Sequence, residues 1–306
     1  MIMLKIERIL IPLDLNKPNE DIVSAASEWV KFWGATELHF IYVLPVQVPV
    51  STFDAWMQAS LPAQDFEGLR LDAEVSFDAI RQKLGDLPAQ VVTKILYDVN
   101  VAHAILQYAD DAKMDLVMME THGRKGLERF LMGSVAETVV QKVHTPVLTM
   151  HPPFKAPNVK TILVPTDFST HAQTALIEAG KIAQTAQAQI RLLHIVLEEG
   201  MPPYYDPYWK YLRGKEAMRG RIYRLMNNFL RQSGVTDVPV QKSIRFGNAA
   251  SEIVTFAEKE HCDLIVLPTH GLTGLAHLLM GSVAEQVTRK APVPVLTLKS
   301  HPQINR

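Results

Sequence analysis

Short apolar runs alternate along the chain with longer segments in which apolar residues recur every three or four positions. The run at 9–14, Ile-Leu-Ile-Pro-Leu-Asp, is followed by a segment at 20–33 whose apolar side chains fall on one helical face. Continuous apolar runs of this length are typical of buried parallel strands. The pattern therefore predicts a strand and then a helix, which ends at Gly34.

The same alternation continues to the end of the chain. Further strands are predicted at 38–43, 91–96, 115–119 and 146–150 in the first half, and at 162–167, 190–196, 240–245, 263–267 and 294–298 in the second. Further helices are predicted at 66–83, 101–112 and from Ser134, and then at 172–186, 214–232, 251–260 and from Ser282. Such alternation indicates a doubly wound parallel sheet in each half.

The second half of the chain repeats the first. Residues 121–150 and 269–298 align without a gap and are identical at 18 of 30 positions, which indicates a duplicated domain. The proline-rich segment 152–157 lies between the copies and is expected to be a short, semi-rigid linker. We therefore predict two tandem Rossmann-like α/β domains, at 1–151 and 158–306, each with a doubly wound parallel sheet.

Each copy contains a Gly-Ser pair directly before a helical segment, Gly133-Ser134 in the first and Gly281-Ser282 in the second. A glutamate follows each serine by three residues, which is the spacing of a capping box with the serine as N-cap. The first N–H groups of a helix attract anions, and glycine lets an anion approach closely. Each pair is therefore either a phosphate-binding site or only a helix cap.

Composition sets broad limits on the class of protein. A chain of 306 residues with 47% hydrophobic residues can bury two cores, and its net charge of -1 gives no overall attraction for nucleic acid. One cysteine, Cys262, excludes an internal disulfide, and early charged residues argue against a signal peptide. No apolar run is long enough to span a membrane, so we expect a soluble cytoplasmic protein.

The polar residues at the strand ends suggest where a ligand would bind. Ligands of doubly wound sheets lie beyond the carboxyl ends of the strands, where the strand order reverses. Asp14 and Asp167 follow the first strand of each half, and Tyr42 and His194 lie near the end of the second strand. The two glycine-containing loops follow the fourth strands. We expect these groups to converge on one crevice in each domain.

These motifs resemble those of the universal stress protein family, and the resemblance covers the chain as two consecutive domains. Pro-x-Asp follows the first strand of each half, at 12–14 and 165–167, and both halves have a Thr-His-Gly loop. Both also carry Gly-x9-Gly-Ser, at 123–134 and 271–282. Nucleotide-binding members of that family have Gly-x2-Gly-x9-Gly-Ser/Thr. In them the aspartate and the end of strand two lie near the adenosine, and the later glycines and the serine hold the phosphates.

The resemblance implies that the ligand is ATP or another adenine nucleotide, with or without Mg2+. The binding residues that it implies in the second half are Pro165, Thr166, Asp167, Ser169, His194, Ile195, Gly247, His270, Gly271, Gly281, Ser282 and Val283. Those in the first half are Asp14, Gly123, Gly133 and Ser134. We find no catalytic residue, and we expect no metal site built by the protein alone, because His261-Cys262 has no partner pair at zinc spacing.

Both halves depart from the family pattern at its first glycine, which is Glu120 in the first half and Pro268 in the second. Each residue places a side chain where the backbone of the family approaches the ligand. The carboxylate of Glu120 would in addition repel a polyphosphate unless a metal ion lay between them.

The first half differs from the second at other candidate positions as well. Leu13 replaces Thr166, Asp98 replaces Gly247, and no residue corresponds to Ser169. The cations at 124–125 in the first loop do not outweigh these changes, because exposed loop cations are usually only solvated. We therefore expect the nucleotide in the second half and a degenerate or regulatory first half.

Several candidates have simpler interpretations. The two aspartates could cap the loops that follow them, and His122 and His270 could hydrogen-bond nearby backbone. The aromatic run at 204–211 could form a lid or a partner surface, but packing on its own domain is the simpler interpretation. Neither a Walker loop nor a Gly-x-Ser-x-Gly elbow is present.

The terminal strands of the two halves bear on assembly. Residues 146–150 and 294–298 occupy the position of the edge strand that joins two domains antiparallel in the resembled family. An exposed apolar edge needs a partner, and the duplication places a matching edge in the same chain. We therefore expect an internal pseudo-dimer about a two-fold axis, with a homodimer as a possible further assembly.

Three functions are open on this basis. The first, which we favour, is an adenine-nucleotide-binding stress-response protein with a regulatory or survival role and slow or no hydrolysis, because no general base is evident. The second is an interaction or scaffold protein of the same fold that has lost its ligand, as Glu120 and Pro268 suggest. The third is a slow ATP-hydrolysing enzyme, which would need a positioned nucleophile or an acid–base pair.

Overall fold

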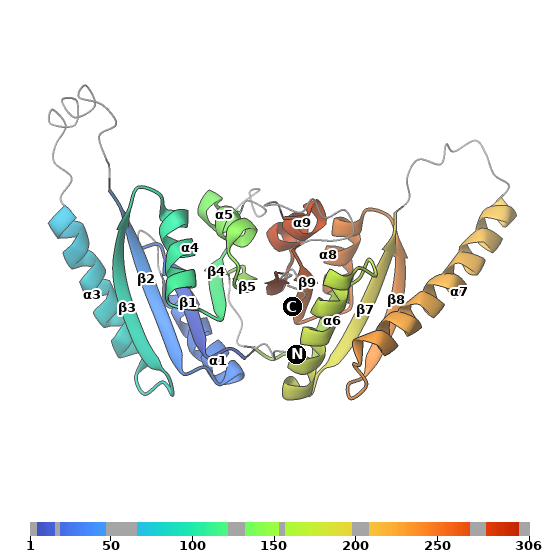
Figure 1. Cartoon of the computed structure of the whole chain (residues 1–306), viewed down its shortest axis with the longest axis horizontal. Helices are drawn as coiled ribbons and strands as arrows, with labels where there is room; N and C mark the ends of the chain where they lie inside the picture. Colours follow the sequence, from blue (N-terminus) through green and yellow to red (C-terminus); the bar gives the residue numbers. More distant parts are fainter. Residues whose placement is uncertain are drawn as a thin grey trace, which may run out of the picture.

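In the parts of the chain that the computed structural model describes, ten strands form a single sheet with helices on both faces (Figure 1). These parts are residues 5–15, 19–46, 66–121, 132–152, 157–197, 208–269 and 280–299, with backbone only for 208–215. Strands and helices alternate along the chain, as the apolar pattern predicts.

The two halves contain matching elements. The first half has β1 (Arg8–Leu13), α1 (Glu20–Trp33), β2 (Glu37–Pro45), α3 (Phe66–Leu84), β3 (Gln90–Asp98), α4 (Val101–Asp111), β4 (Leu116–Glu120), α5 (Ser134–Lys142) and β5 (Val147–Met150). The second has β6 (Thr161–Pro165), α6 (Thr170–Ala186), β7 (Gln189–Val196), α7 (Tyr208–Ser233), β8 (Val240–Phe246), α8 (Ala249–Lys259), β9 (Leu264–Pro268), α9 (Ser282–Lys290) and β10 (Val295–Leu298).

The strand order is that of two doubly wound sheets joined at one edge. It reads β3-β2-β1-β4-β5 through the first half and then β10-β9-β6-β7-β8 through the second. Neighbouring strands within each half are parallel. The predicted fold class, two tandem Rossmann-like domains, is therefore confirmed. The domain boundaries stay a prediction, because residues 153–156 of the linker lie outside the described residues.

The two halves meet where β5 pairs with β10, and this pair is antiparallel. Leu148 lies opposite Leu296, and both side chains are fully buried. The hydroxyl of Thr149 donates to the carbonyl of Val295 at 3.3 Å, and the hydroxyl of Thr297 donates to the carbonyl of Val147 at 3.2 Å. The predicted pairing of the terminal strands is thus confirmed, and neither strand is an exposed edge.

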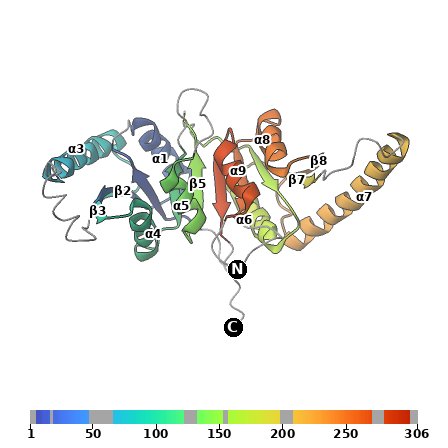
Figure 2. The same ribbon diagram turned by 90° about the horizontal axis from the view of Figure 1, so that it is seen from above.

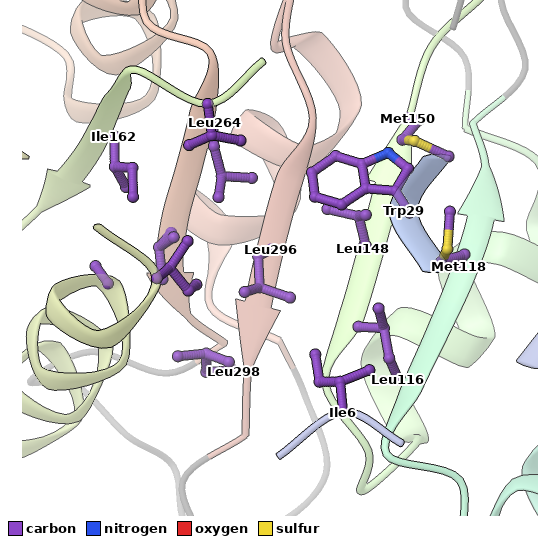
Figure 3. Close-up of a cluster of buried hydrophobic side chains, with 14 of the residues drawn as sticks. Ile6, Trp29, Leu116, Met118, Leu148, Met150, Ile162, Leu264, Leu296 and Leu298 are labelled. Carbon is purple, nitrogen blue, oxygen red and sulfur yellow. The ribbon is translucent and has the colours of Figure 1, made fainter. Parts of the chain in front are cut away.

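The hydrophobic core continues through this junction on both faces of the sheet. Side chains alternate along each strand, so Ile9 and Ile11 pack on one face and Leu10 on the other. Each face has a buried cluster that contains residues of both halves. Figure 3 shows part of one cluster, with Leu148 and Leu296 between side chains of the two halves. The halves therefore share their core across the junction.

Side chains from each half also reach the last helix of the other half. His151 directly follows β5, and its ring hydrogen-bonds with the hydroxyl of Thr121 at 2.8 Å. The pKa of His151, which burial lowers, is raised in part by the backbone of Thr288 in α9, so this backbone lies beside the ring. Lys299 directly follows β10 and donates to the carbonyl of Gln141 in α5. A helix leaves its last carbonyls without intrahelical partners, so both contacts use groups that need a donor.

An ion pair joins these two helices directly. Arg289 of α9 lies 3.8 Å from the carboxylate of Glu137 in α5 and 3.5 Å from that of Glu285 in its own helix. Figure 2 shows α5 and α9 side by side over the junction. Strand pairing, shared core and crossed polar contacts together make the internal pair of domains that the duplication predicts.

The sequence pattern located most elements within one or two residues, and α7 is the exception. Its helix begins at Tyr208, six residues before the predicted start at 214, and is 26 residues long. Gly214, the predicted start, lies inside the helix although glycine disfavours helix interiors. None of the described helices, α7 included, is both long and apolar enough to cross a membrane.

Truncation of Leu296, which lies opposite Leu148 at the junction, should destabilise both halves together. Leu296→Ala removes a fully buried side chain from a core that both halves share, so the free energy of unfolding should fall by about 2–5 kcal/mol. Urea denaturation followed by circular dichroism measures this change. Leu197→Ala, at a position that is 59% exposed, is the control and should change stability little. Two separate transitions in the wild type would contradict a shared core.

Lys299 should make stability depend on pH above neutrality. Burial lowers the pKa of Lys299 from 10.5 to about 8. Between about pH 8 and 10.5 Lys299 therefore holds a proton in the unfolded chain that it has lost in the folded chain, so the contribution of Lys299 to stability should rise with pH across this window. Urea denaturation at several pH values should show a smaller rise for Lys299→Met than for the wild type. Replacement of the exposed Lys160 by Met should leave the dependence of stability on pH as it is in the wild type. If Lys299→Met showed the same dependence on pH as the wild type, Lys299 would not be its source.

Candidate functional site

The candidate residues of the second half lie along one edge of the sheet. The strand order β9-β6-β7-β8 brings together the carboxyl ends of four parallel strands. Thr166 and Asp167 follow β6, His194 and Ile195 lie in the last part of β7, and Gly247 follows β8. From β6 the chain continues to β7 on one side, whereas from β9 it continues to β10 on the other side. The strand order therefore reverses between β6 and β9, as it does at ligand sites of this fold.

The loop after β6 is held by short-range hydrogen bonds. The N–H of Phe168 donates to the hydroxyl of Thr166 at 3.0 Å, and the N–H of Ser169 donates to the carboxylate of Asp167 at 3.0 Å. The hydroxyl of Ser169 in turn accepts from the N–H of Ala172 at 3.1 Å, as the N-cap of α6. Asp167 and Ser169 therefore shape the loop, which the sequence allowed as the simpler interpretation.

Two rings flank this loop at the end of β7. The imidazole of His194 hydrogen-bonds through Nδ1 with the carbonyl of Thr166 at 2.8 Å. Its ring lies 4.5 Å from that of Phe168, with a tilt of 31°. Phe168 also contacts Phe229 of α7 edge to face at 5.7 Å. The rings of His194 and Phe168 are therefore stacked on each other, and both are half-buried.

Phe168 has a left-handed backbone, with φ at 65°. A bulky residue in this conformation costs about 1–3 kcal/mol, and it persists where the surroundings determine it. Here the hydrogen bond to Thr166 and the contacts with two rings supply that support. No sequence pattern points to this residue, because its backbone angle depends on packing against elements distant in the chain.

The start of α9 is fixed against the end of β9. The N–H of Gly281 donates to the carbonyl of Thr269 at 2.7 Å, and the N–H of Thr269 donates to the carbonyl of Leu298 at 3.0 Å. Thr269 is fully buried, whereas Ser282 is exposed. The first N–H groups of α9 thus sit at the carboxyl edge of β9, the strand next to β6.

The predicted capping boxes are wrong in both halves. The N-cap of α5 is Gly133 and that of α9 is Gly281, so each serine is the first helical residue. The glutamates are directed elsewhere, since Glu137 accepts from Gln141 at 3.4 Å and Glu285 pairs with Arg289. Both glycines are extended, with ψ near 145°, which any residue adopts. The serine hydroxyls therefore do not serve as N-caps.

Gly247 has a backbone reason to be glycine. Its φ is 137°, a region that side-chain-bearing residues rarely adopt, and its N–H donates to the carbonyl of Val196 at 3.0 Å. An added Cβ would lie 3.4 Å from the side chain of Glu252. In the first half the corresponding residue, Asp98, accepts from the N–H of Asn100 at 2.8 Å and pairs with His103 at 2.7 Å. The hydrogen bond from His103 is the main reason why the pKa of Asp98 is lowered.

The site of the first half is chemically different. Leu13 stands where Thr166 stands in the second half, so the loop after β1 lacks the hydroxyl that accepts a loop N–H. Tyr42 lies opposite Leu13, at the position of His194. The pKa of Tyr42 is raised by burial and then by the negative charge of Asp14, which places these two side chains near each other. The carbonyl of Asp14 accepts from the side-chain amide of Asn19 at 3.2 Å.

Glu120 and Pro268, which replace the first glycine of the family pattern, lie at the ends of β4 and β9. Glu120 is the last residue of β4 and pairs in register with Met150, and Pro268 is the last residue of β9 and pairs with Leu298. Both are partly exposed at the carboxyl edge. Some predicted residues lie outside the described residues, namely His122, Gly123, the cations at 124–125, residues 204–207 of the aromatic run, His270 and Gly271.

The amino-acid sequence matches the universal stress protein family twice, over residues 5–151 and again over residues 158–299. The chain belongs to the universal stress protein family. Both matches span a complete five-stranded unit, so this universal stress protein is of the tandem type.

Relatives of this universal stress protein match it over one half or over both. A universal stress protein of Methanocaldococcus jannaschii is 33% identical over 143 residues, which are 46% of this chain and 82% of that protein. One from Mycolicibacterium smegmatis is 23% identical over 295 residues, which are 95% of this chain and 96% of that protein. The crystal structure of a universal stress protein from Archaeoglobus fulgidus has the same fold, with a TM-score of 0.68, 20% identity and coverage of 96% of this chain and 98% of that one.

The N-cap role of Ser169 can be tested in this universal stress protein by stability alone. Ser169→Ala removes the acceptor for the N–H of Ala172, so the free energy of unfolding should fall by about 0.5–2 kcal/mol. Urea denaturation measures the change. Thr170→Ala, at the exposed next position, is the matched control and should have a smaller effect. Equal stability of Ser169→Ala and wild type would contradict the cap.

Proposed function

We propose that this protein binds ATP or another adenine nucleotide at the carboxyl edge of its second half and acts as a regulatory stress-response protein. The observation that carries the proposal is the position of the α9 N-terminus. Gly281 is held at 2.7 Å from the carbonyl of Thr269, so the first N–H groups of α9 lie at the strand next to the Thr166–Asp167 loop. Phosphate donors and polar groups for a nucleoside would then share one edge.

The phosphates would bind at the start of α9. The first turn of a helix offers N–H groups and the positive end of the helix dipole. The N-cap is glycine, so the N-cap itself places no side chain between these N–H groups and an anion, and the exposed Ser282 adds a hydroxyl donor. Because Gly281 and not Ser282 is the N-cap of α9, the serine hydroxyl does not serve as the cap acceptor. This supports its assignment as a donor to the phosphates.

The nucleoside would lie over the ends of β6 and β7. The rings of Phe168 and His194 form a half-buried stacked pair, and a purine base could extend this stack. Asp167 stands beside this pair as the polar group for a ribose, with Ile195 at the end of β7. This arrangement matches what the family resemblance implies for the aspartate and for the end of strand two.

Hydrolysis should be slow or absent. Asp167 is the acidic residue that the resemblance places near the nucleotide, and its carboxylate accepts the N–H of Ser169. A group in that role fixes a loop and is poorly placed to activate water. Among the described residues no three His, Cys, Asp or Glu side chains are grouped as metal ligands, so Mg2+ would depend mainly on phosphate oxygens.

The first half is proposed as a degenerate or regulatory site. Glu120 places a carboxylate at the end of β4, and Leu13 and Tyr42 replace the polar pair Thr166 and His194. A carboxylate near the position of the phosphates disfavours binding electrostatically. One nucleotide per chain is therefore the expected stoichiometry.

The second candidate function is an interaction protein without a ligand. The observation that favours it is the presence of side chains at both first-glycine positions, Glu120 and Pro268, at the edge where the nucleotide would lie. A chain of this kind would bind no adenine nucleotide and would act through protein contacts. A homodimer, proposed from the sequence, is compatible with either function.

Calorimetry with one substitution at the start of α9 tests the proposed site. Wild type should bind ATP, and Gly281→Asp should lower the affinity at least about tenfold, because the new carboxylate repels the phosphates. Aspartate is a favourable N-cap, and an added Cβ would lie 3.4 Å from Thr269, an ordinary contact, so the helix should remain intact. Titrations with ATP, ADP and AMP, with and without Mg2+, would identify the preferred nucleotide.

Gly133→Asp supplies the matched control, since it makes the same change at the equivalent N-cap of α5. Its affinity and stoichiometry should equal those of the wild type. Unchanged binding by Gly281→Asp would remove the α9 site, and absence of binding by the wild type would favour the interaction protein. Timed hydrolysis in the same buffers would identify a slow ATPase.

A further inference from the structure

Charge is divided unequally between the two halves of the chain. Residues 1–151 contain 13 Lys and Arg against 20 Asp and Glu, and residues 152–306 contain 18 against 12. Helix α7 alone contains seven Lys and Arg against one acidic residue, Glu216. The near-zero net charge of the whole chain therefore hides an acidic first half and a basic second half, with the positive charge concentrated on one helix.

Helix α3 is the counterpart of α7, and its charges are paired within the helix. Arg70 forms ion pairs with Glu67 at 2.6 Å and with Glu74, and Arg81 pairs with Asp78 at 2.5 Å. These pairs neutralise the bases of α3 locally. Because α3 has four acidic residues against three basic ones, it keeps an acidic surface after this pairing.

The arginines of α7 are not paired in this way. Within the part of the chain that the structure describes, none of its four arginines with placed side chains forms an ion pair. They are Arg219, Arg221, Arg224 and Arg231. Arg231 donates to the amide oxygen of Asn228 at 3.2 Å, and Arg219 lies over the ring of Phe246 at 5.2 Å. No ion pair with a described residue therefore neutralises their positive charges.

Both helices also expose apolar side chains beside these charges. Among the placed side chains of α7, the hydrophobic residues Ile222, Met226 and Phe229 are buried, whereas Met218 is 43% exposed and Leu225 is 51% exposed. On α3, Leu71 is 49% exposed and Val75 is 69% exposed. Leu71 and Val75 are four residues apart, so they lie on one side of the helix, near Asp72 and Asp78. Acidic and apolar groups on α3 thus match basic and apolar groups on α7.

These two helices cannot meet within one chain. The sheet order places them over the outermost strands of the two halves, and α3 and α7 lie at opposite ends of the molecule (Figure 1, Figure 2). The α3 surface can therefore cover α7 only if it belongs to another molecule. The acidic first half of a second copy has the opposite charge and is present at the same concentration as α7 itself.

We propose that α7 of one chain docks on the α3 surface of a second copy, and that this contact makes the protein a salt-sensitive homo-oligomer. Arg221 and Arg224 would face Asp72 and Asp78 across the contact, and Leu225 and Met218 would cover Leu71 and Val75. Arginine suits this role because its planar donor group binds carboxylates in pairs of hydrogen bonds. The contact joins unlike surfaces, so its copies either close into a pair or extend into a longer assembly.

The experiment is sedimentation velocity of the full chain over a range of concentrations at low and high salt. Wild type should associate at low salt and dissociate as salt screens the charges. Arg221→Glu with Arg224→Glu should raise the dissociation constant about tenfold or more, since attraction becomes repulsion. Lys160→Glu with Lys259→Glu makes the same change in net charge at exposed positions of the same half, and it should leave association unchanged.

Mixing two variants tests the identity of the surfaces. Asp72→Lys with Asp78→Lys should also abolish self-association, because it removes the acidic side of the contact. A mixture of this variant with Arg221→Glu and Arg224→Glu restores one intact pair of surfaces, so the mixture should associate although each variant alone is monomeric. Circular dichroism should show the same helical content for all variants, since each altered position is exposed.

Three results would overturn the proposal. They are a wild type that stays monomeric at low salt, association that the α7 substitutions do not change, and variants whose mixture does not associate. A monomeric wild type whose α7 binds single-stranded oligonucleotides or anionic vesicles, with loss in Arg221→Glu and Arg224→Glu, would assign the surface to a foreign polyanion instead.

Discussion

The antiparallel pairing of β5 with β10 is the contact on which the rest of the structure depends. Either strand alone would be an apolar edge with unpaired backbone groups. Paired, they carry the core on both faces of the sheet from one half into the other. The hydroxyls of Thr149 and Thr297 strengthen the pairing, and His151 and Lys299 support the last helix of the opposite half. Each half thereby completes the sheet of the other.

This junction also bears on the two candidate sites. Helices α5 and α9 begin at the Gly-Ser pairs and end where side chains of the opposite half contact their last carbonyls. The same helices are linked by Arg289 and Glu137. Helix α9 is thus held near both ends, by Thr269 at its N-terminus and by the ring of His151 near its C-terminus. Rigid elements of this kind hold binding groups more precisely than loops do.

Much of the fold follows from the sequence because it is written in local periodicity. The bounds of α1 were predicted correctly, since its apolar face is regular and Gly34 adopts the left-handed conformation that ends it. The site was predicted less well because its details depend on distant contacts. The N-cap of α9 is glycine and not serine, since the bond from Gly281 to Thr269 fixes that residue in an extended conformation. The left-handed conformation of Phe168 could not be predicted, because it is set by contacts with Thr166, His194 and Phe229.

The fused junction has a consequence for how such a protein can change over evolutionary time. Two identical subunits that meet about a two-fold axis present every residue twice, so a mutation in their contact alters both partners at once. A single chain that contains both partners is released from this requirement. His151 and Lys299 occupy equivalent places in the two halves yet are different residues, as are Tyr42 and His194. Fusion therefore allows the two copies to carry different residues at equivalent places, which identical subunits cannot do.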